Sequence, residues 1–216
     1  MKTIRAFTLI ELLIVVAIIA ILAAIAVPNF LEAQVRSKAS RVKSDLRSVV
    51  TALEAYAVDQ NDYPHMDREG NHHWLQYVHE LTSPVAYISS VTLVDPFNPH
   101  AKILVDAENR DLPNYKGSYG YYNYNSAFFA DYYPPETRVR GGVVNSFGPD
   151  NINNGSSYIV PYYIIPGPFS SAPPPVGYGS YPAPGWVYML YDSTNGTRSA
   201  GDIVKLFGAC PGPQTD

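Results

Sequence analysis

The sequence predicts an α+β fold in which one long N-terminal α-helix packs on a small antiparallel β-sheet domain. Two observations predict it. An apolar run begins at Phe7 and continues as a one-sided apolar stripe with helical spacing to about Gln60. Beyond that point, short strand-forming stretches alternate with Gly, Pro and Asn turns, and short turns join antiparallel neighbours. A long helix laid on such a sheet is an α+β architecture.

The first part of the helix, residues 7–28, has the length and composition of a membrane span. The 21 residues from Phe7 to Val27 are polar only at Thr8 and Glu11. At ~1.5 Å per residue they cover ~30 Å, which is the thickness of the hydrocarbon core of a bilayer. The segment therefore serves an apolar environment, either lipid or a bundle of similar helices.

A secretory signal cut after Ala26, or an uncut signal anchor, would also explain an apolar run that follows Lys2 and Arg5. Glu11 argues against both interpretations, because a carboxylate inside a membrane costs on the order of 2–3 kcal/mol and needs a partner. The helical pattern that continues downstream argues against removal of the segment. The two basic residues favour a cytoplasmic N-terminus.

The second part, residues 29–60, continues the helix as an amphipathic segment. Its apolar residues recur at alternating spacings of four and three, which places them on one face. They are Val35, Ala39, Val42, Leu46, Val49, Leu53 and Tyr56. A kink or locally open turn is expected at Pro28, because proline removes a helical hydrogen bond. Asn61 and Pro64 are stop signals for the helix.

A cluster of basic residues lies mainly off this apolar stripe. Its members are Arg36, Lys38, Arg41, Lys43 and Arg47. A solvated helix face is the simplest interpretation, and a contact between subunits is the second. Nucleic acid is not an expected partner, because the cluster lacks interleaved aromatic residues and the chain has a net charge of −4.

Residues 61–216 are expected to form the globular domain. A short helix over Trp74–Leu81 would bury Trp74, Val78 and Leu81. Strands are predicted at Lys102–Val105, Tyr119–Asn125, Gly142–Phe147, Ser157–Ile165, Trp186–Tyr191 and Asp202–Phe207. Residues 167–185, rich in Pro, Gly, Ser and Tyr, are expected to form a loop. The single cysteine, Cys210, excludes an intramolecular disulfide.

The stretch from Ala6 to Phe30, AFTLIELLIVVAIIAILAAIAVPNF, resembles the N-terminus of type IV pilins and type II secretion pseudopilins. The resemblance implies a pilin-like fold. It also implies that residues 1–6 are a leader removed by prepilin peptidase, and that Phe7 becomes the methylated first residue. Ala6 departs from the family pattern, which has Gly before the cleaved bond.

The resemblance also gives Glu11 a partner, as the fifth residue of the mature chain. Cleavage would free the amine of Phe7, whose unperturbed pKa of about 7.7–8 makes it a cation. Glu11 of a neighbouring subunit would neutralise this amine when two helices slide into register. Glu11 is therefore expected to select correct assembly.

Three short pieces resemble the major pseudopilin in particular. Asp95–Phe97 is similar to the Asp-Pro-Trp before its sheet, and Asn145–Asp150 to its strand and turn. The loop Asp192–Ile203 is similar to its calcium loop, so calcium is the expected cofactor. Its expected ligands are Asp192, Asn195, Thr197, Ser199 and Asp202. A turn-rich hairpin held by side chain–backbone hydrogen bonds is the alternative, and two carboxylates suggest a dissociation constant on the order of 10⁻⁴–10⁻³ M.

Enzymatic motifs are missing from the sequence, so no catalytic residue is expected. Zinc is not expected either, because the histidines have no zinc-site spacing. They are His65, His72, His73, His79 and His100. The tyrosine-rich tract 115–191 is expected to pack the sheet, although it could also present stacking faces to a sugar.

These features predict a structural subunit of a type II secretion pseudopilus or type IV pilus-like filament. Its expected location is the bacterial inner membrane, with a single pass and an extracytoplasmic domain. Its expected partners are further copies of itself, other pseudopilins, prepilin peptidase, and the inner-membrane assembly platform with its ATPase. The alternative is a membrane-tethered binding module whose Tyr-rich domain recognises a glycan or surface ligand.

Overall fold

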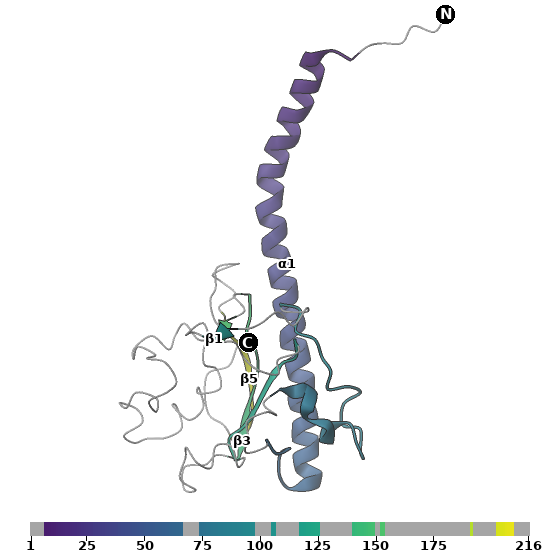
Figure 1. Cartoon of the computed structure of the whole chain (residues 1–216), viewed down its shortest axis with the longest axis vertical. Coiled ribbons are helices and arrows are strands. Elements are labelled where there is room, and N and C mark those ends of the chain that lie inside the picture. Colours follow the sequence, from purple (N-terminus) through teal and green to yellow (C-terminus); the bar gives the residue numbers. More distant parts are fainter. Residues whose placement is uncertain are drawn as a thin grey trace, which may run out of the picture.

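The structure is a computed structural model, and it describes residues 7–66, 74–97, 105–106, 117–125, 140–149, 152–153, 191 and 202–209. It consists of one long helix, α1 (Leu9–Gln60), whose C-terminal half packs against a small β-sheet domain. Figure 1 shows the N-terminal half of α1 projecting alone beyond the domain. We call the exposed apolar run of this projecting part, residues 7–31, the stalk. The α+β arrangement predicted from the sequence is confirmed.

Both ends of α1 are defined by local interactions. Thr8 is the N-cap residue, and Asn61 ends the helix in the left-handed conformation with φ of 56°, which asparagine tolerates better than most residues. The predicted end of the helix at Asn61 is thus confirmed. The helix continues through Pro28 as a gently curved rod (Figure 1), so a locally open turn is not present there. A kink at Pro28 stays a prediction.

The main sheet has three antiparallel strands in the order β2–β3–β5. They are β2 (Gly120–Asn123), β3 (Gly141–Ser146) and β5 (Ile203–Gly208). The ends of each strand lie within one or two residues of those predicted from the sequence. The register places Val143 opposite both Tyr122 of β2 and Leu206 of β5. The predicted strand Ser157–Ile165 lies outside the described residues, as does Trp186–Tyr191 except for its last residue.

A second, two-stranded pair differs from the prediction. Strand β1 (Val105–Asp106) pairs in parallel with β4 (Ile152–Asn153). Only the last residue of the predicted strand Lys102–Val105 falls in β1, and nothing in the sequence predicted a strand at β4. A two-residue strand is too short for an alternating pattern, so the sequence carries no signal for it.

The prediction of one short helix over Trp74–Leu81 is wrong about the type of structure. The chain forms two short 3₁₀ turns there, η1 (Leu75–Tyr77) and η2 (His79–Leu81). The reason is a competing pairing, because the amide of Leu75 donates to the Tyr119 carbonyl at 2.9 Å and Trp74 pairs with Gly120 beside β2. The predicted burial is nevertheless confirmed, since Trp74, Val78 and Leu81 are all buried.

The core lies between α1 and the sheet. The buried residues of α1 follow the predicted stripe, and they are Ala39, Val42, Leu46, Val49, Ala52 and Leu53. Aromatic rings fill much of the opposing side. The ring of Tyr121 stacks on Phe207 with 5.7 Å between centroids, and Tyr63 contacts the same phenylalanine at 4.8 Å. Such ring pairs stabilise a small core beyond the area that they bury.

Carboxylates of α1 fix the helix to the sheet. Glu54 accepts hydrogen bonds from the Gly208 amide at 2.7 Å and the Tyr63 hydroxyl at 2.9 Å. Asp45 accepts one from the Tyr119 hydroxyl at 2.7 Å. These contacts join residues 154 and 74 positions apart. They satisfy groups at the margin of the core, and burial raises the pKa of Tyr119 far above its ordinary value.

Leu46→Ala tests whether the stripe on α1 holds the domain together. Leu46 is 1% exposed, and removing such a side chain usually destabilises a protein by about 2–5 kcal/mol. Val58→Ala is the matched control on the same helix, because Val58 is 83% exposed; its expected effect is within about 0.5 kcal/mol. Urea unfolding of the detergent-solubilised chain, followed by near-ultraviolet circular dichroism, measures both. Equal effects would contradict this assignment of the core.

Candidate assembly site

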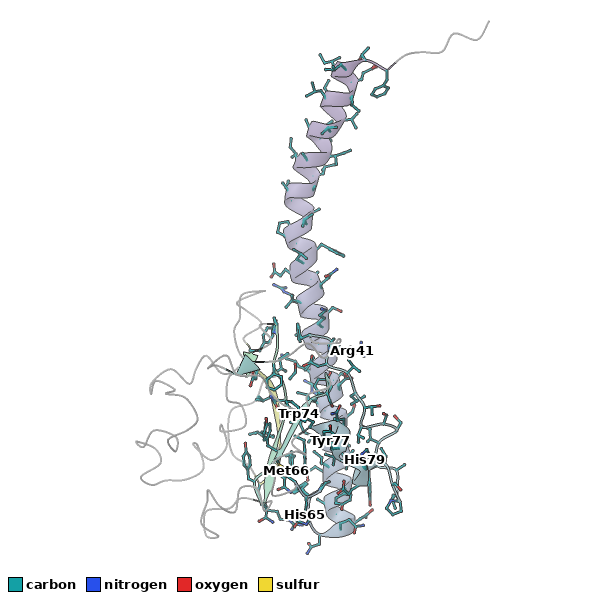
Figure 2. The ribbon with its side chains drawn as sticks, viewed as in Figure 1. Arg41, His65, Met66, Trp74, Tyr77 and His79 are labelled. Carbon is teal, nitrogen blue, oxygen red and sulfur yellow. The ribbon has the colours of Figure 1, made fainter. Side chains whose placement is uncertain are left out.

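The stalk exposes its large apolar side chains on all sides. None of the residues from Phe7 to Leu31 is buried, and Leu9 is 76% exposed. Figure 2 shows these side chains pointing outward around the helix, with no other segment packed against them. Within the described residues, α1 is the helix long and apolar enough to cross a membrane, judged by length and composition alone. A surface of this kind needs a covering of lipid or of other protein.

Thr8 and Glu11 form a capping box at the start of α1. The amide and the hydroxyl of Thr8 donate to Oε2 of Glu11 at 2.8 Å and 2.7 Å. In return, the amide of Glu11 donates to the Thr8 hydroxyl at 3.3 Å. The box satisfies backbone donors that a helix N-terminus leaves without a partner. It also places a negative charge where the helix dipole favours one.

This geometry changes the interpretation of Glu11 reached from the sequence. The carboxylate has a partner within its own chain, which sequence reasoning missed although Thr-x-x-Glu before an apolar run is a known signature of a capping box. Only Oε2 is used, and Oε1 accepts no hydrogen bond from the part of the chain that the structure describes. Phe7, 71% exposed, lies directly before the cap. One carboxylate oxygen is thus oriented within its chain while the other faces outward.

The structure brings together only part of the predicted site residues. Ala6 lies outside the described residues, and Pro28 lies inside α1. Of the predicted calcium ligands, only Asp202 is described, and Asp192, Asn195, Thr197 and Ser199 fall outside. The calcium site therefore stays a prediction.

Asp202 has a carboxylate that could bind a cation, and it also interacts with other residues of the chain. It is fully buried next to the start of β5, and its carbonyl accepts a hydrogen bond from the Tyr191 amide at 2.9 Å. Asp202 has at least one further interaction. Among the described residues, no group of three or more His, Cys, Asp or Glu side chains could hold a metal ion.

The tyrosines of the described residues mostly pack rather than face solvent. Those of the tract 115–191 that are described are buried, namely Tyr119, Tyr121, Tyr122, Tyr124 and Tyr191. The hydroxyls of Tyr119 and Tyr121 donate to nearby polar groups, Asp45 and the Pro64 carbonyl, each at 2.7 Å. These five residues follow the packing interpretation and are not faces for stacking a sugar.

Two separate pieces that resembled the major pseudopilin meet in the fold. Ser146 donates to Oδ2 of Asp95 at 2.6 Å, and the Phe97 amide donates to Oδ1 at 2.9 Å. The same serine hydroxyl accepts from the Gly148 amide at 3.2 Å. Asp95 thereby joins the segment before the sheet to the end of β3. The sequence contained both pieces but gave no sign that they touch.

Asp95 is a buried carboxyl group with an altered titration. It is 1% exposed, and burial raises its pKa to about 6, against the opposing effect of the hydrogen bonds from Ser146 and Phe97. The charge of Asp45 raises the pKa further, while Lys38 lowers it. Lys38 reaches this region by placing its ammonium group 5.8 Å from the centroid of the Phe97 ring.

Comparison with known proteins bears on the N-terminal segment. Residues 1–27 match the model of the prokaryotic N-terminal methylation motif. The N-terminal segment of the chain is thus similar to that of type IV pilins and of a type II secretion pseudopilin. Pilins and pseudopilins are structural subunits rather than enzymes.

The relatives include type IV pilus proteins and a type II secretion system protein. The type IV major pilin protein PilA of Myxococcus xanthus is 54% identical over 59 residues, which is 27% of each chain. The type IV wide pilus major component PilA4 of Thermus thermophilus is 49% identical over 63 residues, 29% of this chain and 48% of the relative. The type II secretion system core protein G of Pectobacterium carotovorum is 37% identical over 60 residues, 28% of this chain and 38% of the relative.

The matched stretches span between about a quarter and a half of these relatives. No solved structure matches the chain.

Asp95→Asn tests the buried carboxyl group. The unfolded chain ionises Asp95 near pH 4, whereas the folded chain keeps it protonated up to about pH 6. The folded state therefore binds more protons between these values, so stability falls as the pH rises through them, by on the order of 3 kcal/mol in total. Asparagine keeps an oxygen for the Phe97 amide but cannot ionise, so its variant should lose this part of the pH dependence.

Unfolding in urea at about pH 5 and pH 7.5 measures the effect. Ser146→Ala is the companion variant, because it removes a hydrogen bond that stabilises the carboxylate and should steepen the loss of stability toward pH 7.5. Identical pH profiles for the wild type and Asp95→Asn would show that Asp95 has no such role.

Proposed function

We propose that the chain is a structural subunit of a type II secretion pseudopilus or type IV pilus-like filament, and that it polymerises through the stalk. The observation that carries the proposal is an apolar helix segment, exposed on every side, with an oriented carboxylate at its start. A lone apolar stalk is costly in water, and a bundle of identical stalks buries it. A head-to-tail contact of this kind repeats without closing, which produces a filament.

The proposal includes processing at the N-terminus. Prepilin peptidase would cut between Ala6 and Phe7 and methylate the new terminus, and the match of residues 1–27 to the methylation motif supports this step. Before assembly, the stalk would anchor the subunit in the inner membrane as a single span, with the domain outside the cytoplasm. An assembly platform with its ATPase would then extract the subunit, and other pseudopilins would be co-subunits.

Glu11 would act in assembly through the oxygen that the cap leaves available. Oε2 is held by Thr8 within the chain, so the side chain does not have to be ordered when a second subunit arrives. Oε1 would then accept the charged amine of Phe7 from the neighbour. In an apolar bundle this pairing removes two exposed charges at once, and a helix out of register leaves both without a partner.

Calcium binding at the 192–202 loop belongs to the proposal as well. The position of Asp202 supports calcium binding, because this carboxylate residue is buried beside β5. The ion would stabilise the end of the domain that leads into the last strand. Calcium is expected to raise the unfolding temperature of the wild type, and Asp202→Asn should lose that response. A calcium-independent unfolding temperature in the wild type would remove the ion from the proposal.

Glu11→Gln and Glu11→Ala together test the assembly role. Glutamine keeps an oxygen that can accept from Thr8, so the cap survives while the charge is lost. Both variants should yield at least tenfold less filament in the fraction sheared from cells, because neither can neutralise the Phe7 amine. Wild-type yield from Glu11→Gln would contradict ionic pairing, and wild-type yield from both would contradict any role of Glu11 in assembly. Thr8→Ala measures the cap separately and should reduce the yield less.

The mass of the mature N-terminus tests the processing step. Mass spectrometry of the protein from the producing cell should give a chain that begins at Phe7 with one added methyl group. Ala6→Gly restores the family pattern and should be processed at least as completely. An intact residue 1–6 segment in assembled filaments would contradict the proposed cleavage.

A further inference from the structure

The part of α1 that lies along the domain carries opposite charges at its two ends. The basic band contains five Lys or Arg residues and only one acidic residue, Asp45. Its basic members are Arg36, Lys38, Arg41, Lys43 and Arg47. From residue 48 to residue 62 the chain has three acidic residues and no Lys or Arg. Those residues, Glu54, Asp59 and Asp62, form the acidic end together with Glu80. Burial raises the pKa of Tyr56, and the charges of Glu80 and Asp62 raise it further, so both carboxylates lie near this end of α1.

Both charged regions reach solvent. Lys38, Arg41 and Arg47 are exposed in the basic band, and Asp59 and Glu80 are exposed at the acidic end. Figure 2 places Arg41 where the stalk meets the domain, whereas His65 and His79 mark the opposite end of the domain. The two regions are therefore separated along the long axis of the molecule.

Two ion pairs involve the basic band within the part of the chain that the structure describes. Arg36 pairs with Glu32, and Arg41 lies 3.8 Å from Asp45. Arg140 approaches the acidic end, where its guanidinium lies 3.4 Å from the side-chain oxygen of Asn61. By formal charge, the basic band has five cations against the single carboxylate of Asp45, and the acidic end has four carboxylates.

The two regions cannot pair within one chain. Lys43 and Asp59 are 16 residues apart on one continuous helix, and at ~1.5 Å per residue that is ~24 Å along its axis. A second copy shifted along the axis can bring them together, because a shift of 18 residues, or ~27 Å, places Asp59 level with Arg41. Parallel copies at such a shift still overlap along their apolar stalks.

We propose that the basic band of one subunit docks on the acidic end of a second copy and fixes the axial position of that copy. This copy differs from the neighbour whose Phe7 amine meets Glu11, because Phe7 and Glu11 are four residues apart and come level at a shift of only ~6 Å. This inference rests on the proposed filament function and adds to it a contact outside the stalk. Exposed ion pairs contribute little one by one, so the contact acts through the group of charges. Like charges would face each other in a wrong register, and this repulsion is what makes the contact selective.

A second copy fits the basic band better than anionic lipid does. Leu31 is the last large apolar residue of the exposed run. Arg36 and Lys38 lie ~7–10 Å beyond it along the helix, but Arg47 lies ~24 Å beyond it. Lipid headgroups attract charges only within about one Debye length, ~8 Å at physiological ionic strength. Most of the basic band is thus too far from a membrane surface that ends near Leu31.

Charge exchange in the full-length chain tests the contact. Arg41→Glu with Arg47→Glu, and separately Asp59→Lys with Glu80→Lys, should each lower the yield of sheared filaments at least fivefold. The combined fourfold variant should recover at least half of the wild-type yield, because positions 41 and 59, which lie level at the proposed shift, again carry opposite charges. Arg41→Lys with Arg47→Lys is the matched control and should assemble like the wild type. Near-ultraviolet circular dichroism checks that each variant is folded.

Zero-length cross-linking gives a second, independent measurement. A carbodiimide joins a lysine to a carboxylate only when they touch, so wild-type filaments should yield a peptide that links Lys38 or Lys43 to Asp59. Because ~24 Å or more separates these residues in one chain, such a peptide reports a contact between copies.

The outcomes separate this inference from the proposed function. Wild-type filaments with no recovery in the fourfold variant, or with no such peptide, would overturn the contact and leave the filament function standing. A loss confined to the basic variant, with the acidic variant normal, would assign the basic band to lipid or another partner and also overturn it. Absence of any wild-type filament would overturn both proposals.

Discussion

The structure depends on one helix that satisfies nearly all of its own backbone hydrogen bonds from Leu9 to Gln60, with Pro28, which has no amide hydrogen, as the exception. Because so few backbone groups in its interior need an external partner, the same element can lie in lipid, in a bundle of helices or against a sheet. Side chains alone decide which neighbour each part accepts. The stalk is apolar all round, while beyond Ala39 a single apolar face turns toward the sheet. The chain thus changes environment along its length without changing its backbone.

A few ionised side chains of the helix accept hydrogen bonds from the domain and help to hold the two together. Only 16% of residues are charged, yet Asp45 and Glu54 connect α1 to Tyr119 directly before β2, to β5 and to the segment after the helix. Their partners here are the hydroxyls of Tyr119 and Tyr63 and the amide of Gly208. Tyrosine suits this position because it can fill a core with its ring and still supply a hydrogen-bond donor at the edge.

The sequence predicted what depends on local pattern and missed what depends on contacts between distant segments. The spacing of Val42, Leu46 and Val49 was enough to place the helix and its buried face, and alternation with turns placed β2, β3 and β5. The contact of Asp95 with Ser146 spans 51 residues, and no periodicity reports such a distance. The 3₁₀ turns after Trp74 likewise follow from a pairing with Tyr119 and Gly120, which overrode a helical spacing. The capping box at Glu11 could have been predicted from the pattern Thr-x-x-Glu. The sequence prediction considered the cost of the carboxylate in a membrane and not this local hydrogen bonding.

The continuity of α1 also has a mechanical consequence. In the proposed filament each subunit is pulled along its axis, and the stalk and the domain-facing half are one uninterrupted rod (Figure 1). Tension applied at the stalk therefore passes down the helix, parallel to its hydrogen bonds, before it reaches the sheet. The sheet is attached along the side of the helix, so axial force does not pass through it. A strand of the sheet can therefore detach under force while α1, which carries the tension, remains folded.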